Sequence, residues 1–237
     1  MEKAKSVAAL LKGNPYPGRG IVAGQSADGK IALAYFIMGR SENSRNRVLE
    51  EREGALYTRA FDESKVKDPS LIIYPAMRRL GEEIMLTNGD QTDTIYDARK
   101  AGVSFFDALE SRTYEPDAPN YTPRISALFR LAAPYSYDMS ILQRGKSGEC
   151  LRRRFTYAGE SGVGHLIHTY LTDGDPLPSF TGEPKRISIP AEIDAFATEL
   201  WEALDEENKI SLFVRFIHPA TGETETRLFN KHERSDK

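Results

Sequence analysis

Residues 20–38 read GIVAGQSADGKIALAYFIM, two apolar runs separated by the polar segment QSADGK. Asp28 and Gly29 lie between the runs, and glycine adopts positive φ without a steric penalty. An Asp-Gly pair in this position is a strong signal for a β-hairpin. The stretch therefore predicts two antiparallel strands, for which the rest of the chain must supply neighbours.

Other apolar runs predict further strands. The run at residues 123–132 alternates, with Ile125, Ala127 and Phe129 on one face and charged or small polar residues between them, which predicts a half-buried strand. Pro75 within another run indicates an edge strand or a bulge, because proline cannot donate a ladder hydrogen bond. The predicted strands, beyond the first hairpin, are residues 71–77, 82–89, 123–132, 136–145, 150–159, 164–172, 210–219 and 224–232.

Helical periodicity occurs in three places. Residues 2–12 form a short amphipathic pattern, residues 92–110 repeat apolar side chains at helical spacing, and residues 191–206 carry one apolar stripe. Thr92 or Asp93 can cap the second of these helices. Residues 173–184 hold three prolines and predict a functional loop. Many locally paired strands with few helices predict an α+β fold with antiparallel sheets, and we expect one domain spanning residues 1–237.

The composition excludes several classes of protein. The formal net charge of −3, from 32 Lys and Arg against 35 Asp and Glu, provides no overall basic field for nucleic acid or an anionic membrane. Cys150 is the single cysteine, which excludes an internal disulfide and a cysteine-based metal cluster. His165 and His168 fall on opposite faces of a predicted strand, so we expect no metal site there. No apolar run is long enough to span a bilayer, and we expect a cytoplasmic protein.

Small polar and charged residues gather where four apolar segments end. These segments are RSENSRNR (40–47), YPAMRR (74–79), TNGDQTD (87–93) and YEPDAPNYTPR (114–124). Each is compatible with an ordinary solvated turn. Together they predict a polar pocket at the ends of strands. The arginines of the first segment are compatible with a solvated loop or with a phosphate site, since guanidinium matches phosphate in a fork geometry.

The order and spacing of six motifs between Gly18 and Pro184 resemble the archaeal-type inosine monophosphate (IMP) cyclohydrolase family. The motifs are Gly18-Arg19, Ala34-Tyr35 with Arg40-Ser41 and Asn46-Arg47, Tyr74 with Arg78, Thr87-Asn88-Gly89 with Asp93, residues 114–125 and residues 169–184. The resemblance implies a four-layered αββα sandwich similar to the N-terminal-nucleophile hydrolase fold. It also implies a homo-oligomer, a tetramer, that needs no metal or redox cofactor.

The reaction implied by the resemblance closes the last ring of a purine nucleotide. A formamido group condenses with a neighbouring carboxamide and water is lost. By resemblance, Arg47 polarises the formyl oxygen, Tyr74 donates or orients a proton, and Glu115 is the acid or base. The residues that the resemblance assigns to substrate binding are Arg19, Arg40, Ser41, Asn46, Asn88, Gly89, Asp93, Asn120, Tyr121, Thr122 and Arg124.

Two alternatives stay open at this point. The chain departs from the archaeal pattern at Pro75-Ala76 and Asp90-Gln91, both within the predicted pocket. A homologue acting on a different purine-like nucleotide fits these departures. A nucleotide-binding module without catalysis is the other alternative, against which the presence of Arg47, Tyr74 and Glu115 speaks.

Overall fold

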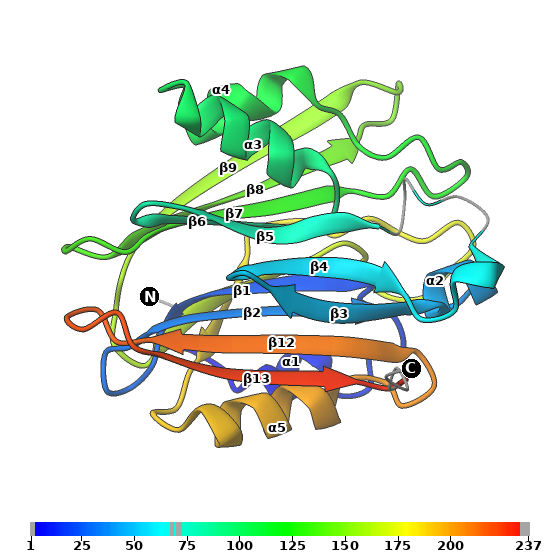
Figure 1. Cartoon of the computed structure of the whole chain (residues 1–237). Helices are drawn as coiled ribbons and strands as arrows, with labels where there is room; N and C mark the ends of the chain where they lie inside the picture. Colours follow the sequence, from blue (N-terminus) through cyan, green and yellow to red (C-terminus); the bar gives the residue numbers. More distant parts are fainter. Residues whose placement is uncertain (1–2, 67–68, 70–72, 233–237) are drawn as a thin grey trace.

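The computed structural model describes residues 3–66, 69 and 73–232. Two antiparallel β-sheets lie face to face, and helices cover their outer faces (Figure 1). The prediction of an α+β fold with antiparallel sheets is therefore confirmed.

The first sheet contains the hairpin predicted at residues 20–38. Arg19 pairs with Ile37 and Gln25 with Ile31, so the Asp28-Gly29 turn connects two antiparallel strands as predicted. The terminal hairpin is also confirmed. In spatial order the strands are β11 (Lys185–Ser188), β10 (Val163–His168), β1 (Arg19–Gln25), β2 (Ile31–Met38), β12 (Lys209–Ile217) and β13 (Thr224–Asn230).

The second sheet follows the chain order from β3 to β9. Its strands are β3 (Arg47–Arg52), β4 (Ala55–Ala60), β5 (Tyr74–Leu80), β6 (Glu83–Thr87), β7 (Arg124–Arg130), β8 (Ser136–Arg144) and β9 (Cys150–Ala158). The hairpin of β3 and β4 was not predicted, because its charged residues hide the alternation. Pro75 lies beside a bulge in β5, where the pairing with β4 skips Ala76, so the predicted bulge is present although β5 is an inner strand. The first residues of the run predicted at 71–77 lie outside the described residues.

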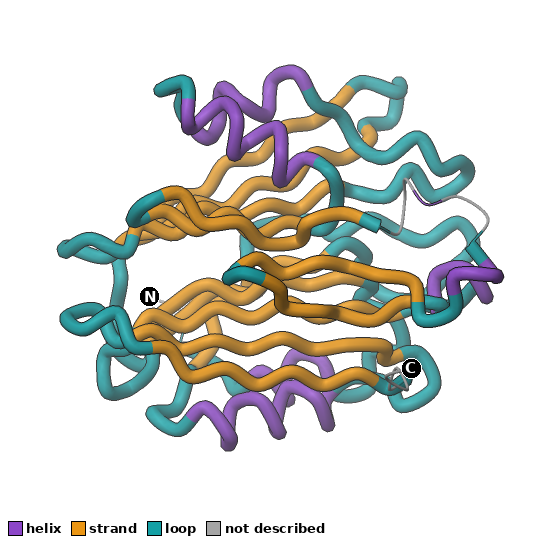
Figure 2. The backbone as a smooth tube through the Cα atoms, viewed as in Figure 1, coloured by secondary structure: helices purple, strands orange, loops and turns teal. Residues whose placement is uncertain are grey.

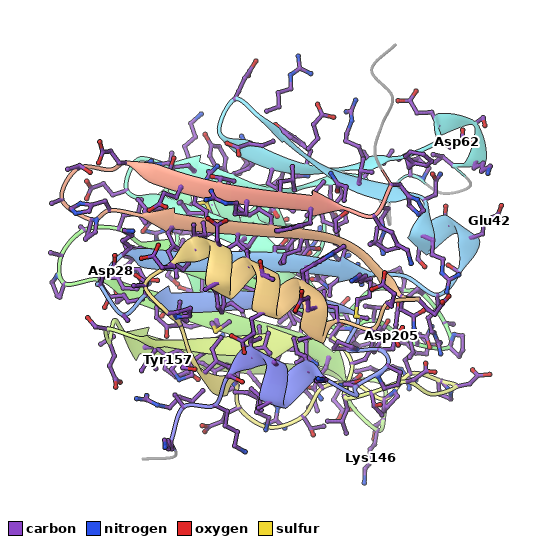
Figure 3. All side chains as sticks on the ribbon, turned by 90° about the horizontal axis from the view of Figure 1, so that it is seen from below. Asp28, Glu42, Asp62, Lys146, Tyr157 and Asp205 are labelled. Atoms are coloured by element: carbon purple, nitrogen blue, oxygen red, sulfur yellow. The ribbon has the colours of Figure 1, made fainter. Side chains whose placement is uncertain are left out.

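Two pairs of helices cover the sheets. Helices α1 (Val7–Leu11) and α5 (Ile193–Ala203) lie side by side under the first sheet (Figure 3). Helices α3 (Gln91–Lys100) and α4 (Phe105–Ala108) lie on the second sheet (Figure 1). Short helical turns η1 (Glu63–Lys65), α2 (Glu42–Arg45) and η3 (Leu109–Ser111) complete the described elements.

Three helix predictions were wrong in detail. The single helix predicted at 92–110 is broken, because Gly102 adopts φ +81° and Ser104 caps a new helix. Neither Thr92 nor Asp93 caps α3, which begins at Gln91. Residue 2 of the helix predicted at 2–12 lies outside the described residues, and α1 begins only at Val7, since Ser6 caps its start. Local caps and one glycine therefore override the longer apolar pattern.

The core has three layers of apolar side chains, one between the sheets and one under each helical layer. Strand β7 was predicted to be half buried, which is wrong. Ile125 and Phe129 pack between the sheets, and Leu128 packs on the opposite face beneath α3 and α4. Because helices cover the outer face as well, β7 is buried on both sides.

Loops gather at the two ends of the stacked sheets (Figure 2). Glu42 lies at one end, and Asp28 and Tyr157 lie at the opposite end (Figure 3). The antiparallel order brings the start of β1 and β7 and the end of β2, β6 and β10 to the end where Glu42 lies. None of the described helices is both long and apolar enough to cross a membrane.

Candidate functional site

A cavity of about 230 Å³ opens between loops at the end of the sheets that holds α2. Its walls come from the start of β1, the end of β2, the α2 turn, the loop before β7 and the segment after β10. The lining residues are Tyr16, Gly18, Arg19, Met38, Arg40, Ser41, Asn43, Ser44, Arg47, Glu115, Asp117, Asn120, Thr122, Tyr170 and Leu177.

Arg19 and Glu115 form the buried part of this pocket. A Cβ atom at Gly18 would lie 2.2 Å from Thr169 Oγ1, so only glycine lets the chain approach β10 and turn Arg19 into the pocket. The Arg19 guanidinium donates to the Asn88 carbonyl oxygen at 3.0 Å and to Glu115 Oε2 at 3.3 Å. Both side chains are less than a tenth exposed. The pair is therefore fixed and largely removed from water.

The position and the raised pKa of Glu115 suit it to proton transfer. Its backbone N–H donates to the Thr122 carbonyl oxygen at 2.9 Å, which fixes the loop before β7. Burial raises the pKa of Glu115 above the ordinary glutamate value, although the charges of Arg19 and Arg124 act in the opposite direction. A carboxyl group with a raised pKa retains its proton closer to neutral pH, as a general acid must.

Arg47 is a buried cation that has no counter-ion among the residues that the structure describes. It is 4% exposed, donates from Nε to the Ser44 carbonyl oxygen at 2.8 Å and from one terminal nitrogen to the Met38 carbonyl oxygen at 3.1 Å. No carboxylate of the described residues forms an ion pair with it. An unpaired buried charge is costly. An anionic group entering the pocket would offset that cost.

Arg40 lies at the rim, where its side chain is 35% exposed. It forms an ion pair with Asp173 and donates to the Gly174 carbonyl oxygen at 3.0 Å. Its guanidinium carbon lies 5.1 Å from the centre of the Tyr16 ring. Arg40 and Arg47 come from one short segment, but Arg40 is solvated and Arg47 is buried.

Three more of the predicted residues line the pocket. Ser41 caps α2 through a hydrogen bond from the Ser44 N–H. Asn120 Oδ1 accepts from the Leu177 N–H at 3.0 Å. Thr122 Oγ1 donates to Asp117 and contacts the Tyr170 hydroxyl. In the described ranges, no group of three or more His, Cys, Asp or Glu side chains is placed to hold a metal ion.

Tyr74 does not line the cavity. Its hydroxyl lies 2.9 Å from the hydroxyl of Tyr35, and both side chains are buried between the sheets. The charges of Arg19 and Arg47 act on the Tyr35 hydroxyl. The tyrosine pair therefore lies behind the two arginines rather than at the pocket surface.

Asn88, Gly89 and Arg124 form a supporting layer. Asn88 donates to the Pro123 carbonyl oxygen at 2.9 Å and accepts from the Ile125 N–H at 2.8 Å, so its side chain is fully engaged. A Cβ at Gly89 would lie 2.7 Å from the Arg124 guanidinium. Arg124 donates to Asp90 and Gln91 and does not reach the cavity lining.

The last three predicted residues lie elsewhere. Asn46 exchanges two hydrogen bonds with the backbone of Asp62 and braces the turn beside β4. Asp93 pairs with Arg78 on the outer side of the second sheet. Tyr121 packs edge-on against another tyrosine ring and beneath the guanidinium of Arg144.

Sequence reasoning did not select several residues of the pocket wall. They are Tyr16, Met38, Asn43, Ser44, Asp117, Tyr170 and Leu177. Most lie inside the polar segments or the motifs that resemble the family. The position of these segments was therefore the only indication of these residues in the sequence. Which side chain of a loop faces inward depends on the loop conformation, which spacing does not determine.

Comparison with known proteins identifies the family of the chain. The family described as IMP cyclohydrolase-like protein matches residues 16–223, which include every residue that lines the cavity. A protein of Methanopyrus kandleri named IMP cyclohydrolase is 38% identical over 117 residues, 48% of this chain and 58% of that protein. A protein of the same name from Methanosphaera stadtmanae is 26% identical over 224 residues, 92% of this chain and 96% of its own length.

A third relative of that name, from Methanococcus maripaludis, is 31% identical over 125 residues, 51% of this chain and 61% of its own length. The more similar stretches thus span somewhat over half the length of these relatives, and the full-length match is weaker. Because the family match covers most of the sequence and the whole cavity wall, the chain belongs to the IMP cyclohydrolase-like protein family.

Proposed function

We propose that the chain is an IMP cyclohydrolase, which closes 5-formamidoimidazole-4-carboxamide ribotide to inosine monophosphate with loss of water. One observation carries the proposal. One pocket holds Arg47, a buried arginine with no counter-ion among the described residues, together with Glu115, a buried carboxyl group of raised pKa. The first can stabilise a developing oxyanion and the second can supply a proton.

The ring closure balances without a metal or a redox partner. The carboxamide nitrogen attacks the formyl carbon, and the carbonyl oxygen becomes an oxyanion. The water that leaves carries this oxygen, one hydrogen from the carboxamide nitrogen and one from the formamido nitrogen. Protonated Glu115 donates one proton to the oxyanion and a second to the hydroxyl group that leaves as water, and after each donation the Glu115 carboxylate recovers one proton from nitrogen. Arg47 stabilises the oxyanion, and its hydrogen bonds to two carbonyl oxygens hold it in position beforehand.

The substrate lies with its phosphate at the rim and its reacting groups inside. Arg40 binds the phosphate, since it is the arginine at the solvent side of the pocket. Arg19 holds Glu115 at the reaction centre. Tyr74 acts through Tyr35, behind the arginines, as a positioning residue. The reacting groups are neighbours on one ring, so orientation requires few further contacts.

Several finer features belong to the same proposal. The stacked sheets with helices on both outer faces support kinship with the N-terminal-nucleophile hydrolase fold. We also propose one functional domain over residues 1–237, a homo-tetramer and a cytoplasmic location, where phosphorylated substrates occur. Light scattering at micromolar protein concentration tests the tetramer, which a monomer would contradict.

Ring closure by the purified chain tests the proposal directly. We expect formation of inosine monophosphate to change the ultraviolet absorbance, with activity retained after prolonged chelation. The Glu115→Gln variant is the matched control, because it keeps the side-chain size and removes the acid. A protein that binds inosine monophosphate without closing the ring would instead be a nucleotide-binding homologue.

A further inference from the structure

The phosphate position proposed for Arg40 already contains an anion. Asp173 forms an ion pair with the Arg40 guanidinium, which also donates to the Gly174 carbonyl oxygen at 3.0 Å. Within the described residues, Asp173 is the carboxylate that Arg40 pairs with. A phosphate arriving at this arginine therefore meets a competitor that belongs to the chain.

The loop that carries Asp173 is anchored independently of Arg40. The Leu171 N–H donates to the Pro178 carbonyl oxygen at 2.8 Å, and Asn14 donates to the Leu171 carbonyl oxygen at 2.9 Å. The Leu177 N–H donates to Asn120 Oδ1 at 3.0 Å, which seats the Leu177 side chain in the pocket wall. Loss of the Asp173 charge therefore leaves these contacts of the loop in place.

The ion pair is weak enough to be exchanged. The Arg40 and Asp173 side chains are 35% and 46% exposed, so water screens their attraction. A phosphate group carries up to two negative charges and matches the guanidinium fork. A nucleoside carries no charge at this position and leaves the ion pair intact.

We propose that Asp173 is a specificity-determining residue that competes with the ligand phosphate for Arg40. This inference rests on the phosphate position in the proposed function. Asp173 neutralises Arg40 in the empty pocket, so only a strongly anionic group with further contacts in the pocket displaces it. The same competition limits the affinity for the phosphorylated product. Asp173 thus sets how strongly the pocket prefers a nucleotide to its nucleoside.

Calorimetric titration with inosine monophosphate, inosine and inorganic phosphate tests this role. We expect Asp173→Asn to lower the Kd for inosine monophosphate and phosphate about fivefold, the loss of a competing exposed ion pair. The Kd for inosine should not change. The matched control is Asp175→Asn, which removes the same charge from the same loop, where no described ion pair involves Asp175.

A double variant isolates the contact. In an Arg40→Gln background, Asp173→Asn should no longer improve binding, because the competition is absent. An unchanged or higher Kd for phosphate and inosine monophosphate in Asp173→Asn overturns the inference, as does an equal improvement in Asp175→Asn.

The two proposals fail in distinguishable ways. Tighter phosphate binding by Asp173→Asn in a protein that does not close the ring contradicts only the proposed cyclohydrolase function. Normal ring closure with unchanged phosphate affinity contradicts only the role of Asp173.

Discussion

The two ends of the interface between the sheets bury polar groups in opposite ways. At the end that holds α2, charged groups surround an open cavity. Arg19 pairs with Glu115, and Arg47 forms no ion pair with another described residue. At the opposite end, marked by Tyr157 in Figure 3, the Tyr137 hydroxyl lies 2.7 Å from His165 Nδ1. The Tyr157 ring stacks on His165 with ring centres 3.6 Å apart.

At this aromatic end, opposite α2, His165 and Tyr157 are uncharged at neutral pH. Burial lowers the pKa of His165 to about 4, with the charge of Arg186 acting in the same direction. Burial raises the pKa of Tyr157 to about 12. Neutral groups with hydrogen-bond partners contribute to stability, whereas buried charges without full compensation cost stability and serve binding. Substitutions at the pocket end should therefore change kcat or KM, whereas substitutions at the aromatic end should change the free energy of unfolding.

The largest effect is expected for Glu115→Gln, which removes the proposed acid. The value of kcat should fall about 1000-fold, within the range for general acid–base catalysis. Since the acid must be protonated, kcat of the unaltered chain should decline as pH rises through the raised pKa of Glu115. Ring-closure rates across pH check both points. A glutamine variant with the activity and pH profile of the unaltered chain would remove Glu115 from the mechanism.

Arg47→Gln should have the next largest effect. Loss of an oxyanion donor lowers kcat by roughly 100-fold or more, with a smaller change in KM, because the charge develops during the reaction. Steady-state ring closure measures both constants. Arg47→Lys is the control that keeps the charge, and it should recover little because the fork geometry is lost. Equal activity of the glutamine variant and the unaltered chain would indicate that Arg47 only supports the loop.

Arg40→Gln should act mainly on binding. Its contact with the phosphate exists before and during the reaction, so KM should rise about tenfold while kcat changes little. The dependence of KM on salt should also weaken. Steady-state kinetics at two ionic strengths check this. A large loss of kcat at unchanged KM would place Arg40 at the reaction centre instead.

Tyr137→Phe, at the aromatic end, should change stability and leave catalysis unchanged. Loss of the hydrogen bond to His165 should lower the free energy of unfolding by about 1 kcal/mol, with kcat and KM unchanged. Denaturant unfolding measures this change. Tyr135→Phe is the matched control, because the buried Tyr135 hydroxyl has no hydrogen-bond partner among the described residues, and its removal should cost little. Equal destabilisation by both variants would refute the role of the hydrogen bond.

The smallest expected effect at neutral pH is on stability, through protonation of the buried histidines. His165 and His168 have pKa values of about 4 in the folded chain and about 6.5 when unfolded, because burial disfavours the charged ring. The unfolded chain therefore binds more protons between these values, and stability should fall as pH decreases from about 6.5 to about 4. Unfolding midpoints of the chain and of His165→Gln across this range check the prediction. The variant should depend less on pH, and identical pH profiles would contradict it.

Local pattern was enough for most of the sheets. The Asp28-Gly29 turn, the hairpin of β8 and β9 and the terminal hairpin were predicted because their apolar residues and turns are adjacent in sequence. Strands β3 and β4 were missed, since charged side chains interrupt their alternation. The pocket segments were also visible as polar ends of apolar runs. The sequence did not show whether the side chains of Arg40 and Tyr74 face the cavity.

The sequence by itself determined the antiparallel pairing, the α+β class and the segments from which a pocket could be built, because neighbouring residues encode these features. Only the tertiary structure decided that Tyr74 lies behind Arg19 and Arg47, that Asp117 and Tyr170 reach the cavity, and that Asp173 pairs with Arg40. The physical reason is that stacking of the two sheets brings together loops distant in the chain. Burial and charge pairing in that space then depend on contacts that no local pattern contains.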